Sequence, residues 1–260
     1  MKAVTATLRN AFGSALPLLV ILVAGLLVMP IAQWGTGQSG FMSGIILGVL
    51  LQTTVGVLFL AQATGTRRVV GIVLIVLAVA WAAEFIGSAT TVPFGGYDYT
   101  SKLQPQLLGV PLLVPLAWLM MLPPAWAVAQ RITGRVSGVT FVAVSALAFT
   151  AWDLYLDPQM VGWGLWVWDV SGPYFGIPLA NFAGWLLISA LITALVRPPA
   201  LPQTPLIVIY ALVWLIEAIG QVFVWGLRGP ALFGFLGMGV FVVLAWRRRR
   251  RGAEVVERGE

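Results

Sequence analysis

Residues 69–89 read VVGIVLIVLAVAWAAEFIGSA, an apolar run whose only charged side chain is Glu84. A helix rises about 1.5 Å per residue, so a run of this length crosses the hydrocarbon core of a membrane, which is about 30 Å thick. Arg67 and Arg68 precede the run and provide a polar end for it. The stretch therefore predicts a transmembrane helix that carries an acid inside the membrane.

Seven further apolar runs occur along the chain. They are Leu16–Ile31, Phe41–Ala63, Leu107–Val128, Val136–Trp152, Pro178–Val196, Leu206–Leu227 and Pro230–Trp246. The chain of 260 residues is 60% hydrophobic and 9% charged, whereas a soluble domain carries roughly a quarter charged residues. We therefore predict an all-α, polytopic membrane bundle of about eight transmembrane helices. Residues 1–246 would form a single transmembrane domain, and residues 247–260 a charged cytoplasmic tail.

The basic side chains are distributed unevenly between the predicted loops. If the N-terminus is inside, all of the 15 Lys and Arg residues except Lys102 and Arg228 lie on the inner side. Basic loops stay in the cytoplasm, so we expect both termini there, in the plasma membrane of a bacterium or archaeon. The net charge of +6 then reflects topology and contact with membrane lipid, not nucleic-acid binding. The arginines at 247–251 are expected to anchor the last span, with binding of anionic lipid as the alternative.

The acids collect toward the opposite leaflet. Apart from three glutamates in the tail, they are Glu84, Asp98, Asp153, Asp157, Asp169 and Glu217. We expect Asp98, Asp157 and Asp169 in external loops, and Glu84 and Asp153 at the outer ends of their spans. Glu217 is expected inside the seventh span.

The chain contains no Cys and no His. This composition excludes disulfides, thiolate nucleophiles, haem or zinc held by imidazole, and a Ser-His-Asp triad. Proton chemistry near neutral pH must therefore rest on carboxylates, tyrosine or water. We predict no metal site and no cofactor.

The pattern W-x-x-E-x-I-G occurs twice, from Trp81 to Gly87 and from Trp214 to Gly220. The two copies fall in the third and seventh predicted spans, which run in the same direction. This spacing indicates two parallel four-helix halves, with chance similarity as the alternative. If the repeat is real, Glu84 and Glu217 face each other across a pseudo-two-fold axis. An acid inside the membrane is costly and usually has a partner, so each glutamate has a functional and a structural interpretation.

Two segments combine acids with aromatic residues. In the first, Tyr97 and Tyr99 flank Asp98 behind a glycine pair, a pattern that an interfacial aromatic loop would also show. In the second, Asp153 and Asp157 are four residues apart and would share a helix face. The segment continues with Trp163, Trp166, Trp168, Asp169, Tyr174, Asn181 and Trp185.

The aspartate pair suggests acid–base chemistry. We expect the helix to end at Asp157, because Pro158 disfavours helical geometry in the residue before it. Two nearby buried carboxyls hinder each other's ionisation, so one can donate a proton while the other acts as a base. Indole faces stabilise a positive charge. These features together describe a site for carbocation chemistry on an alkene. The structural alternative is a helix cap at Asp157 with a belt of interfacial tryptophans.

A series of motifs in this part of the chain resembles the carotenoid 1′,2′-hydratase family. The motifs are Glu84-x-x-Gly87, Pro93-Phe-Gly-x-Tyr97-x-Tyr99-Thr, Gly109-Val-Pro111, Trp118, Asp153 with Asp157-Pro158, and Tyr174-x-Gly176-Ile-Pro178-x-x-Asn181-Phe-x-Gly184-Trp185. They extend from Trp81 to Trp185; outside this stretch only the hydropathy is similar.

The resemblance implies cofactor-free hydration of the terminal double bond of an acyclic carotenoid end. Protonation at C2′ would give a tertiary cation at C1′, which water captures. We expect Asp153 or Asp157 to donate the proton, with Glu84 as the next candidate. Asp98 or Asp169 would orient the water. The residues expected to line the substrate are Tyr97, Tyr99, Trp163, Trp166, Trp168, Asn181 and Glu217. The chain length of the carotenoid and the oligomeric state stay open.

Three other functions use some of the same features. A lycopene-type cyclase begins with the same protonation, but an internal double bond captures the cation. A membrane prenyltransferase would use Asp153 and Asp157 as a D-x-x-x-D motif for Mg²⁺ and diphosphate, although Lys102 and Arg228 are the only external cations. A small-molecule transporter would also suit internal repeats and intramembrane acids.

Overall fold

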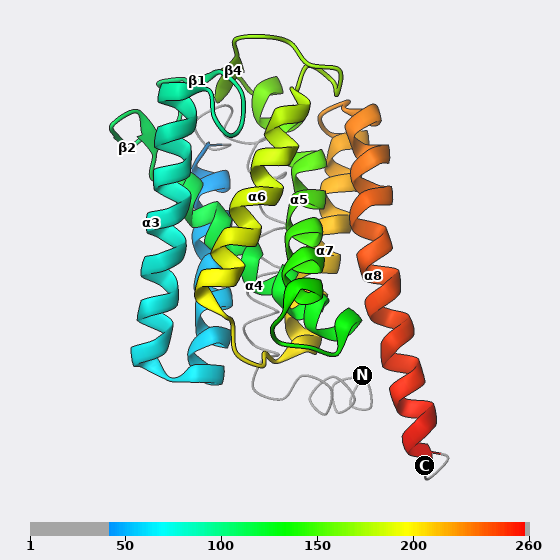
Figure 1. The fold of residues 1–260 in the computed structure, drawn as a ribbon. Helices are drawn as coiled ribbons and strands as arrows, with labels where there is room; N and C mark the ends of the chain where they lie inside the picture. The colour runs from blue at the N-terminus through cyan, green and yellow to red at the C-terminus, as the bar shows by residue number, and fades with distance from the viewer. Residues whose placement is uncertain (1–41, 258–260) are drawn as a thin grey trace.

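The computed structural model describes residues 42–257, and this part of the chain forms a bundle of long helices (Figure 1). The helices are Met42–Thr64, α3 (Thr66–Thr90), α4 (Leu113–Thr133), α5 (Val139–Gly162), α6 (Leu179–Val196), α7 (Gln203–Phe223) and α8 (Arg228–Glu257). Within the described residues, these seven are long and apolar enough to cross a membrane. The prediction of an all-α, multi-pass bundle is therefore confirmed. The first predicted span, Leu16–Ile31, lies outside the described residues.

Helix α4 is the centre of the bundle. It packs against α3, α5, α7 and α8, and 78% of its most apolar window is buried, compared with 50% or less in the other spans. A helix that is apolar on every side is suited to such a position. The same helix carries Trp118, whose side chain is fully buried.

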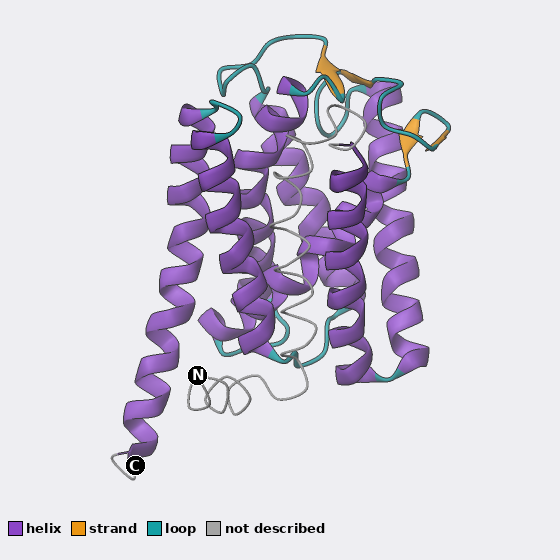
Figure 2. Ribbon diagram, turned by 180° about the vertical axis from the view of Figure 1, so that it is seen from behind, coloured by secondary structure: helices purple, strands orange, loops and turns teal. Residues whose placement is uncertain are grey.

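The two ends of the bundle differ in structure and charge. One end, called here the strand end, carries the four short strands of the described residues, and α8 leaves the bundle at the opposite, basic end (Figures 1 and 2). At the basic end, Arg68 donates a hydrogen bond to the carbonyl of Arg197, 3.0 Å away. Arg131 donates one to Gln203, at 2.5 Å. The charge asymmetry read from the sequence thus corresponds to two distinct ends of the bundle.

The strand end is covered by two short antiparallel strand pairs. Strand β1 (Tyr97–Tyr99) pairs with β4 (Trp166–Trp168), with Tyr97 opposite Trp168 and Tyr99 opposite Trp166. Alternate residues of a strand point to opposite faces, so four aromatic rings share one face. Strands β2 (Gln106–Leu107) and β3 (Val110–Pro111) form the second pair. They occupy the beginning of the predicted span Leu107–Val128, which is why α4 begins only at Leu113.

Helix α5 continues through Asp157 and Pro158 to Gly162, so the prediction that it ends at Asp157 in an external loop is wrong. A proline inside a helix removes the hydrogen bond to the carbonyl four residues earlier. Here that carbonyl, of Leu154, accepts a hydrogen bond of 2.9 Å from the hydroxyl of Tyr174. The adjacent carbonyl of Tyr155 accepts one of 2.8 Å from Gln221. These two side chains satisfy the backbone and let the helix continue.

Candidate active site

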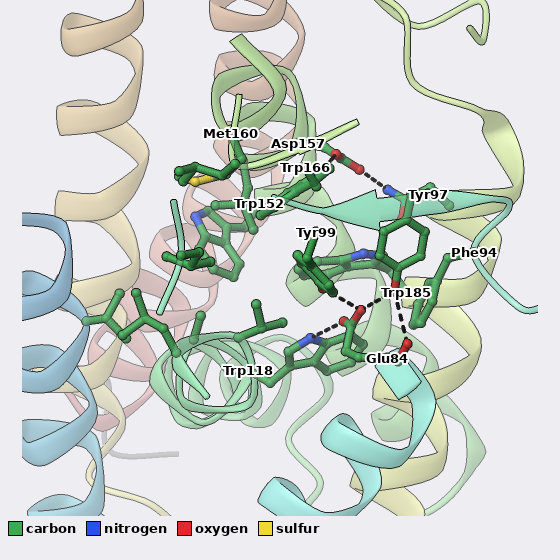
Figure 3. Close-up of a pocket in the computed structure, with 18 of the residues that line it drawn as sticks. Glu84, Phe94, Tyr97, Tyr99, Trp118, Trp152, Asp157, Met160, Trp166 and Trp185 are labelled. Carbon is green, nitrogen blue, oxygen red and sulfur yellow. Dashed lines mark hydrogen bonds between the residues drawn. The ribbon is translucent and has the colours of Figure 1, made fainter. Parts of the chain in front are cut away.

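Glu84 is buried near the strand end of α3 and accepts three hydrogen bonds. Its Oε2 accepts from the hydroxyls of Tyr97, at 2.5 Å, and Tyr99, at 2.8 Å. Its Oε1 accepts from the indole N–H of Trp118, at 3.1 Å. Figure 3 shows these donors converging on the carboxyl group. Three neutral donors are well suited to stabilise a carboxylate in an apolar setting.

The position of β1 depends on Phe94, which packs between two glycines. A Cβ atom at Gly87 on α3 would lie 2.6 Å from the Phe94 ring, and one at Gly184 on α6 would lie 2.5 Å from it. Only glycine leaves room for a phenyl ring between these two helices. With Phe94 fixed in this gap, the following strand places Tyr97 and Tyr99 over Glu84.

Both tyrosines are poor acids in this environment. Burial raises the pKa of Tyr97 above its ordinary value, and the neighbouring Glu84 carboxyl raises it further. Burial and the same carboxyl raise the pKa of Tyr99. The two phenols therefore stay protonated and act as hydrogen-bond donors to Glu84.

Asp153 and Asp157 lie on one face of α5, as their spacing predicted, and share one amide donor. Asn181 on α6 donates from Nδ2 to Oδ2 of Asp153, at 2.7 Å, and also to Oδ2 of Asp157. Oδ1 of Asp157 accepts from the indoles of Trp166, at 2.7 Å, and Trp168, at 3.3 Å. Oδ1 of Asp153 is buried without a partner. The two carboxyls are thus buried together, but Asp157 accepts more hydrogen bonds than Asp153.

Glu84 and Asp157 line one cavity, which we call the aromatic cavity. Its empty volume, together with the part that is open to the surroundings, is about 700 Å³. Its walls are formed mainly by aromatic rings. Figure 3 shows Glu84 and Asp157 at opposite sides of the cavity, with aromatic rings between them. The aromatic lining residues are Phe94, Tyr97, Tyr99, Trp118, Trp152, Trp166, Trp168 and Trp185. Trp118 and Trp185 stack with ring centroids 4.7 Å apart. The arrangement suits a bulky apolar ligand and can stabilise a positive charge through the ring faces.

A second cavity adjoins the first, and its empty volume, together with the part that is open to the surroundings, is about 800 Å³. Its polar lining side chains include Gln52, Gln159 and Glu217, and we call it the glutamine cavity. The two cavities share six lining residues: Ile45, Val49, Met120, Trp152, Leu156 and Met160. The two cavities are therefore neighbours, with Glu84 and Asp157 lining the first and Glu217 lining the second.

Comparison with known proteins connects this geometry to pigment synthesis. Residues 44–241, which include every side chain that lines the two cavities, match the model of a family described as carotenoid biosynthesis proteins. The chain belongs to this family. It is also 33% identical over 124 residues to the bisanhydrobacterioruberin hydratase of Haloarcula japonica. That match covers 46% of this chain and 42% of the relative, so the chain spans less than half of the relative's length. No solved structure matches the chain.

In this member of the carotenoid biosynthesis family, the structure brings most of the predicted site residues together. The aromatic cavity is lined by Glu84, Tyr97, Tyr99, Asp157, Trp166, Trp168 and Asn181. Asp153 is buried beside Asn181 and is not among the lining residues. Trp163 and Glu217 line the glutamine cavity, so Glu217 and Glu84 open into different cavities. Asp98 and Asp169 are exposed and line neither cavity.

Sequence reasoning gave no role to several lining residues. Phe94 and Trp118 were noted only within the motifs of the resemblance, and Trp152 only as the end of a predicted span. Trp185 was noted in those motifs and in the segment after the aspartate pair, without a role of its own. Their roles depend on contacts between separate helices, such as the ring stacking of Trp118 and Trp185. Gln159 was not noted at all. Its position two residues after Asp157 could have indicated a polar side chain on a different face of the same helix.

Proposed function

We propose that this protein is a carotenoid 1′,2′-hydratase, which adds water to the terminal double bond of an acyclic carotenoid end. The proposal rests on family membership and on one structural observation. Asp157, half of a buried carboxyl pair, opens onto a cavity of aromatic rings that also contains Glu84. The hydratase named among the similar proteins supports the same reaction.

Asp157 is the proposed proton donor. Asp153 and Asp157 share the single amide group of Asn181, and one oxygen of Asp153 has no partner. Two indoles also donate to Asp157. Burying two adjacent negative charges would still be very costly, so the pair retains a proton. Asp157 is the member of the pair that reaches the cavity. Its proton would pass to C2′ of the double bond and leave a tertiary cation at C1′.

The cavity opposite Asp157 is suited to stabilise this cation. Glu84, held by two phenols and one indole, would provide a fixed negative charge. The faces of Trp118, Trp152 and Trp185 would add cation–π attraction. Such groups are aligned before the charge develops, which is the usual source of electrostatic stabilisation in enzymes.

Water then completes the reaction. Its oxygen bonds to C1′, one of its protons leaves, and the carboxylate of Asp157 is protonated again, so that alkene and water give a tertiary alcohol. Addition of water to an alkene is neither a net oxidation nor a net reduction, so the proposed reaction needs no redox carrier. Hydration by the purified protein is expected to survive chelation of divalent cations. Activity that is lost on chelation and restored by a divalent ion would contradict this.

We further propose that both termini lie in the cytoplasm and that the two cavities lie toward the outer leaflet. The basic residues at one end of the bundle, including Arg68, Arg131 and Arg197, support this orientation. A reporter fused after Glu260 should then be active only inside the cell. Activity restricted to the outside would reverse the assigned orientation.

The experiment that tests the function is expression in a bacterium that accumulates the acyclic carotenoid lycopene. The proposed reaction predicts new pigments whose mass has increased by one or two water molecules. A new pigment of unchanged mass would instead identify the cyclase alternative. An unchanged pigment profile, with the protein present in the membrane, would contradict both carotenoid reactions on this substrate.

A further inference from the structure

A polar network that the proposed proton donor does not use borders the glutamine cavity: Gln159 and Glu217 line the cavity, and Gln221 lies behind Gln159. Gln221 on α7 donates a hydrogen bond from Nε2 to Oε1 of Gln159 on α5, at 3.1 Å. The side chain of Gln159 in turn forms a hydrogen bond with Glu217. Gln159 and Gln221 are both buried, with 2% and 0% of their surfaces exposed. Three polar side chains from two helices therefore meet at the cavity, which a fourth, Gln52, also lines.

Two acceptor atoms of this network have no partner. Oε2 of Glu217 and Oε1 of Gln221 are both buried and accept no hydrogen bond. Buried acceptors of this kind are usually satisfied, often by an ordered water. Because Glu217 and Gln221 are four residues apart on α7, they share a face of that helix. The ligand that suits two neighbouring acceptors is a small molecule with two O–H donors, which is water.

The network lies next to the proposed reaction centre. Trp152, Leu156 and Met160 form a stripe along α5 and line both cavities, with Asp157 on one side and Gln159 on the other. Met160 and Met120 contribute flexible thioether side chains to the shared wall. A water held at Glu217 therefore adjoins the cavity in which the cation would form. This water would reach the cation from the Gln159 side of the stripe, whereas the proton donor Asp157 lies on the other side.

We propose that Gln159, Glu217 and Gln221 hold the water that captures the carotenoid cation, and that Glu217 accepts its proton. This inference rests on the proposed hydration and assigns a base to it. The water oxygen forms the bond to C1′ while one O–H bond breaks and its proton passes to Glu217. Solvent exchange then returns a proton to the carboxylate of Asp157 and removes one from Glu217. Acid and base are therefore separate groups on opposite sides of the α5 stripe.

The test separates protonation of the alkene from capture of the cation. In heavy water, a cation that forms but is not captured can lose a proton and return to alkene that carries deuterium at C2′. Deuterium in recovered substrate thus reports on the acid, and hydrated product reports on the water. The variants are Glu217→Ala and Glu217→Gln, the second of which preserves the shape of the side chain. Gln221 is left unchanged because it also supports the backbone at Tyr155.

Thr150→Val is the matched control. Thr150 lies on α5, and its Oγ1 is another buried polar atom that has no hydrogen-bond partner. Thr150 lines neither cavity. The substitution removes an equally buried polar atom and keeps the shape of the side chain. We expect this variant to keep both the hydration and the exchange of the wild type.

Both Glu217 variants should lose hydrated product by about 10²-fold per unit of membrane-inserted protein, the lower range for loss of a general base. Their recovered substrate should contain more deuterium than that of the wild type. Two results for Glu217→Gln would overturn the assignment. One is as much hydrated product as the wild type forms, and the other is an equal loss of hydrated product and of deuterium exchange into the substrate. A wild-type protein that forms no hydrated carotenoid would instead overturn the proposed function.

Discussion

Glu84 and Glu217 occupy the same position in two copies of one sequence pattern, yet their surroundings differ. In each copy the tryptophan three residues earlier donates its indole N–H to a backbone carbonyl of a neighbouring element. Trp81 donates to Leu107 at 3.4 Å, and Trp214 donates to Phe235 at 2.8 Å. The glycine of each copy packs against an aromatic ring from the following loop, that of Phe94 or Trp225. The pattern thus produces the same local frame twice.

The difference between the two glutamates comes from the elements that surround this frame. Strand β1 and helix α4 supply three donors to Glu84, so its carboxyl is fully partnered. Glu217 contacts Gln159, and its Oε2 accepts no hydrogen bond. A partnered carboxylate is suited to remain charged and fixed, whereas an open acceptor is suited to bind a small donor. One motif can therefore support two roles in the same reaction, and the following predictions test this division.

The largest effect is expected at Asp157, the proposed proton donor of the aromatic cavity. Asp157→Asn removes the acid but keeps its shape, and should lower hydration by about 10²–10⁴-fold. It should also abolish deuterium exchange into the substrate, which distinguishes it from the Glu217 variants. Asp153→Asn should lose less, because Asp153 contacts Asn181 but does not line the cavity.

Both aspartate variants are measured as hydrated carotenoid per unit of inserted protein. Near-wild-type turnover in both would exclude this pair and make Glu84 the first candidate for the donor. Failure of both proteins to accumulate would favour a purely structural role for the pair.

The next effect concerns the negative charge that we propose for Glu84. Glu84→Gln removes that charge and leaves an amide that cannot accept all three donors, so hydration should fall by about 10²-fold, as on loss of a preorganised electrostatic group. Tyr99→Phe removes one of the three donors, and its hydration activity should fall less. Equal activity of Glu84→Gln and wild type in an assay with purified protein would show that the cation does not depend on this charge.

A smaller effect is expected at Gly87, which leaves room for the Phe94 ring and so fixes the position of β1. Gly87→Ala puts a methyl group against the Phe94 ring, and overpacking of this kind costs about 1–3 kcal/mol. Thermal unfolding in detergent should occur at a lower temperature, and hydration should decrease because β1 shifts. Gly71→Ala on the same helix is the control, since a Cβ there meets nothing within 4 Å. Equal unfolding temperatures for the two variants would contradict the role of Phe94.

The smallest effect is expected from Tyr174, whose hydroxyl replaces the helical hydrogen bond that Pro158 removes from α5. Tyr174→Phe leaves the carbonyl of Leu154 without its donor, and a single intramolecular hydrogen bond contributes about 1 kcal/mol. The variant should unfold slightly earlier than wild type and keep its hydration activity. A loss of activity without a loss of stability would show that Tyr174 takes part in the reaction.

The membrane helices could be predicted from the sequence because hydropathy and length report directly on them. The aspartate pair and the tyrosines of the site were also found, since spacing places Asp153 and Asp157 on one helix face. The pairing of β1 with β4 was not found, because three-residue strands have no distinctive pattern of their own. The continuation of α5 past Pro158 was missed for a related reason. It depends on Tyr174 and Gln221, which lie far away in the sequence.

The central claim is that water adds to a carotenoid end, and labelled water tests it most directly. Purified protein is incubated with an acyclic carotenoid in water that contains a heavy oxygen isotope, and the product is analysed by mass. The account predicts a tertiary alcohol whose oxygen carries the label, formed without added cofactor. An alcohol with unlabelled oxygen, or a product with the mass of the substrate, would contradict it.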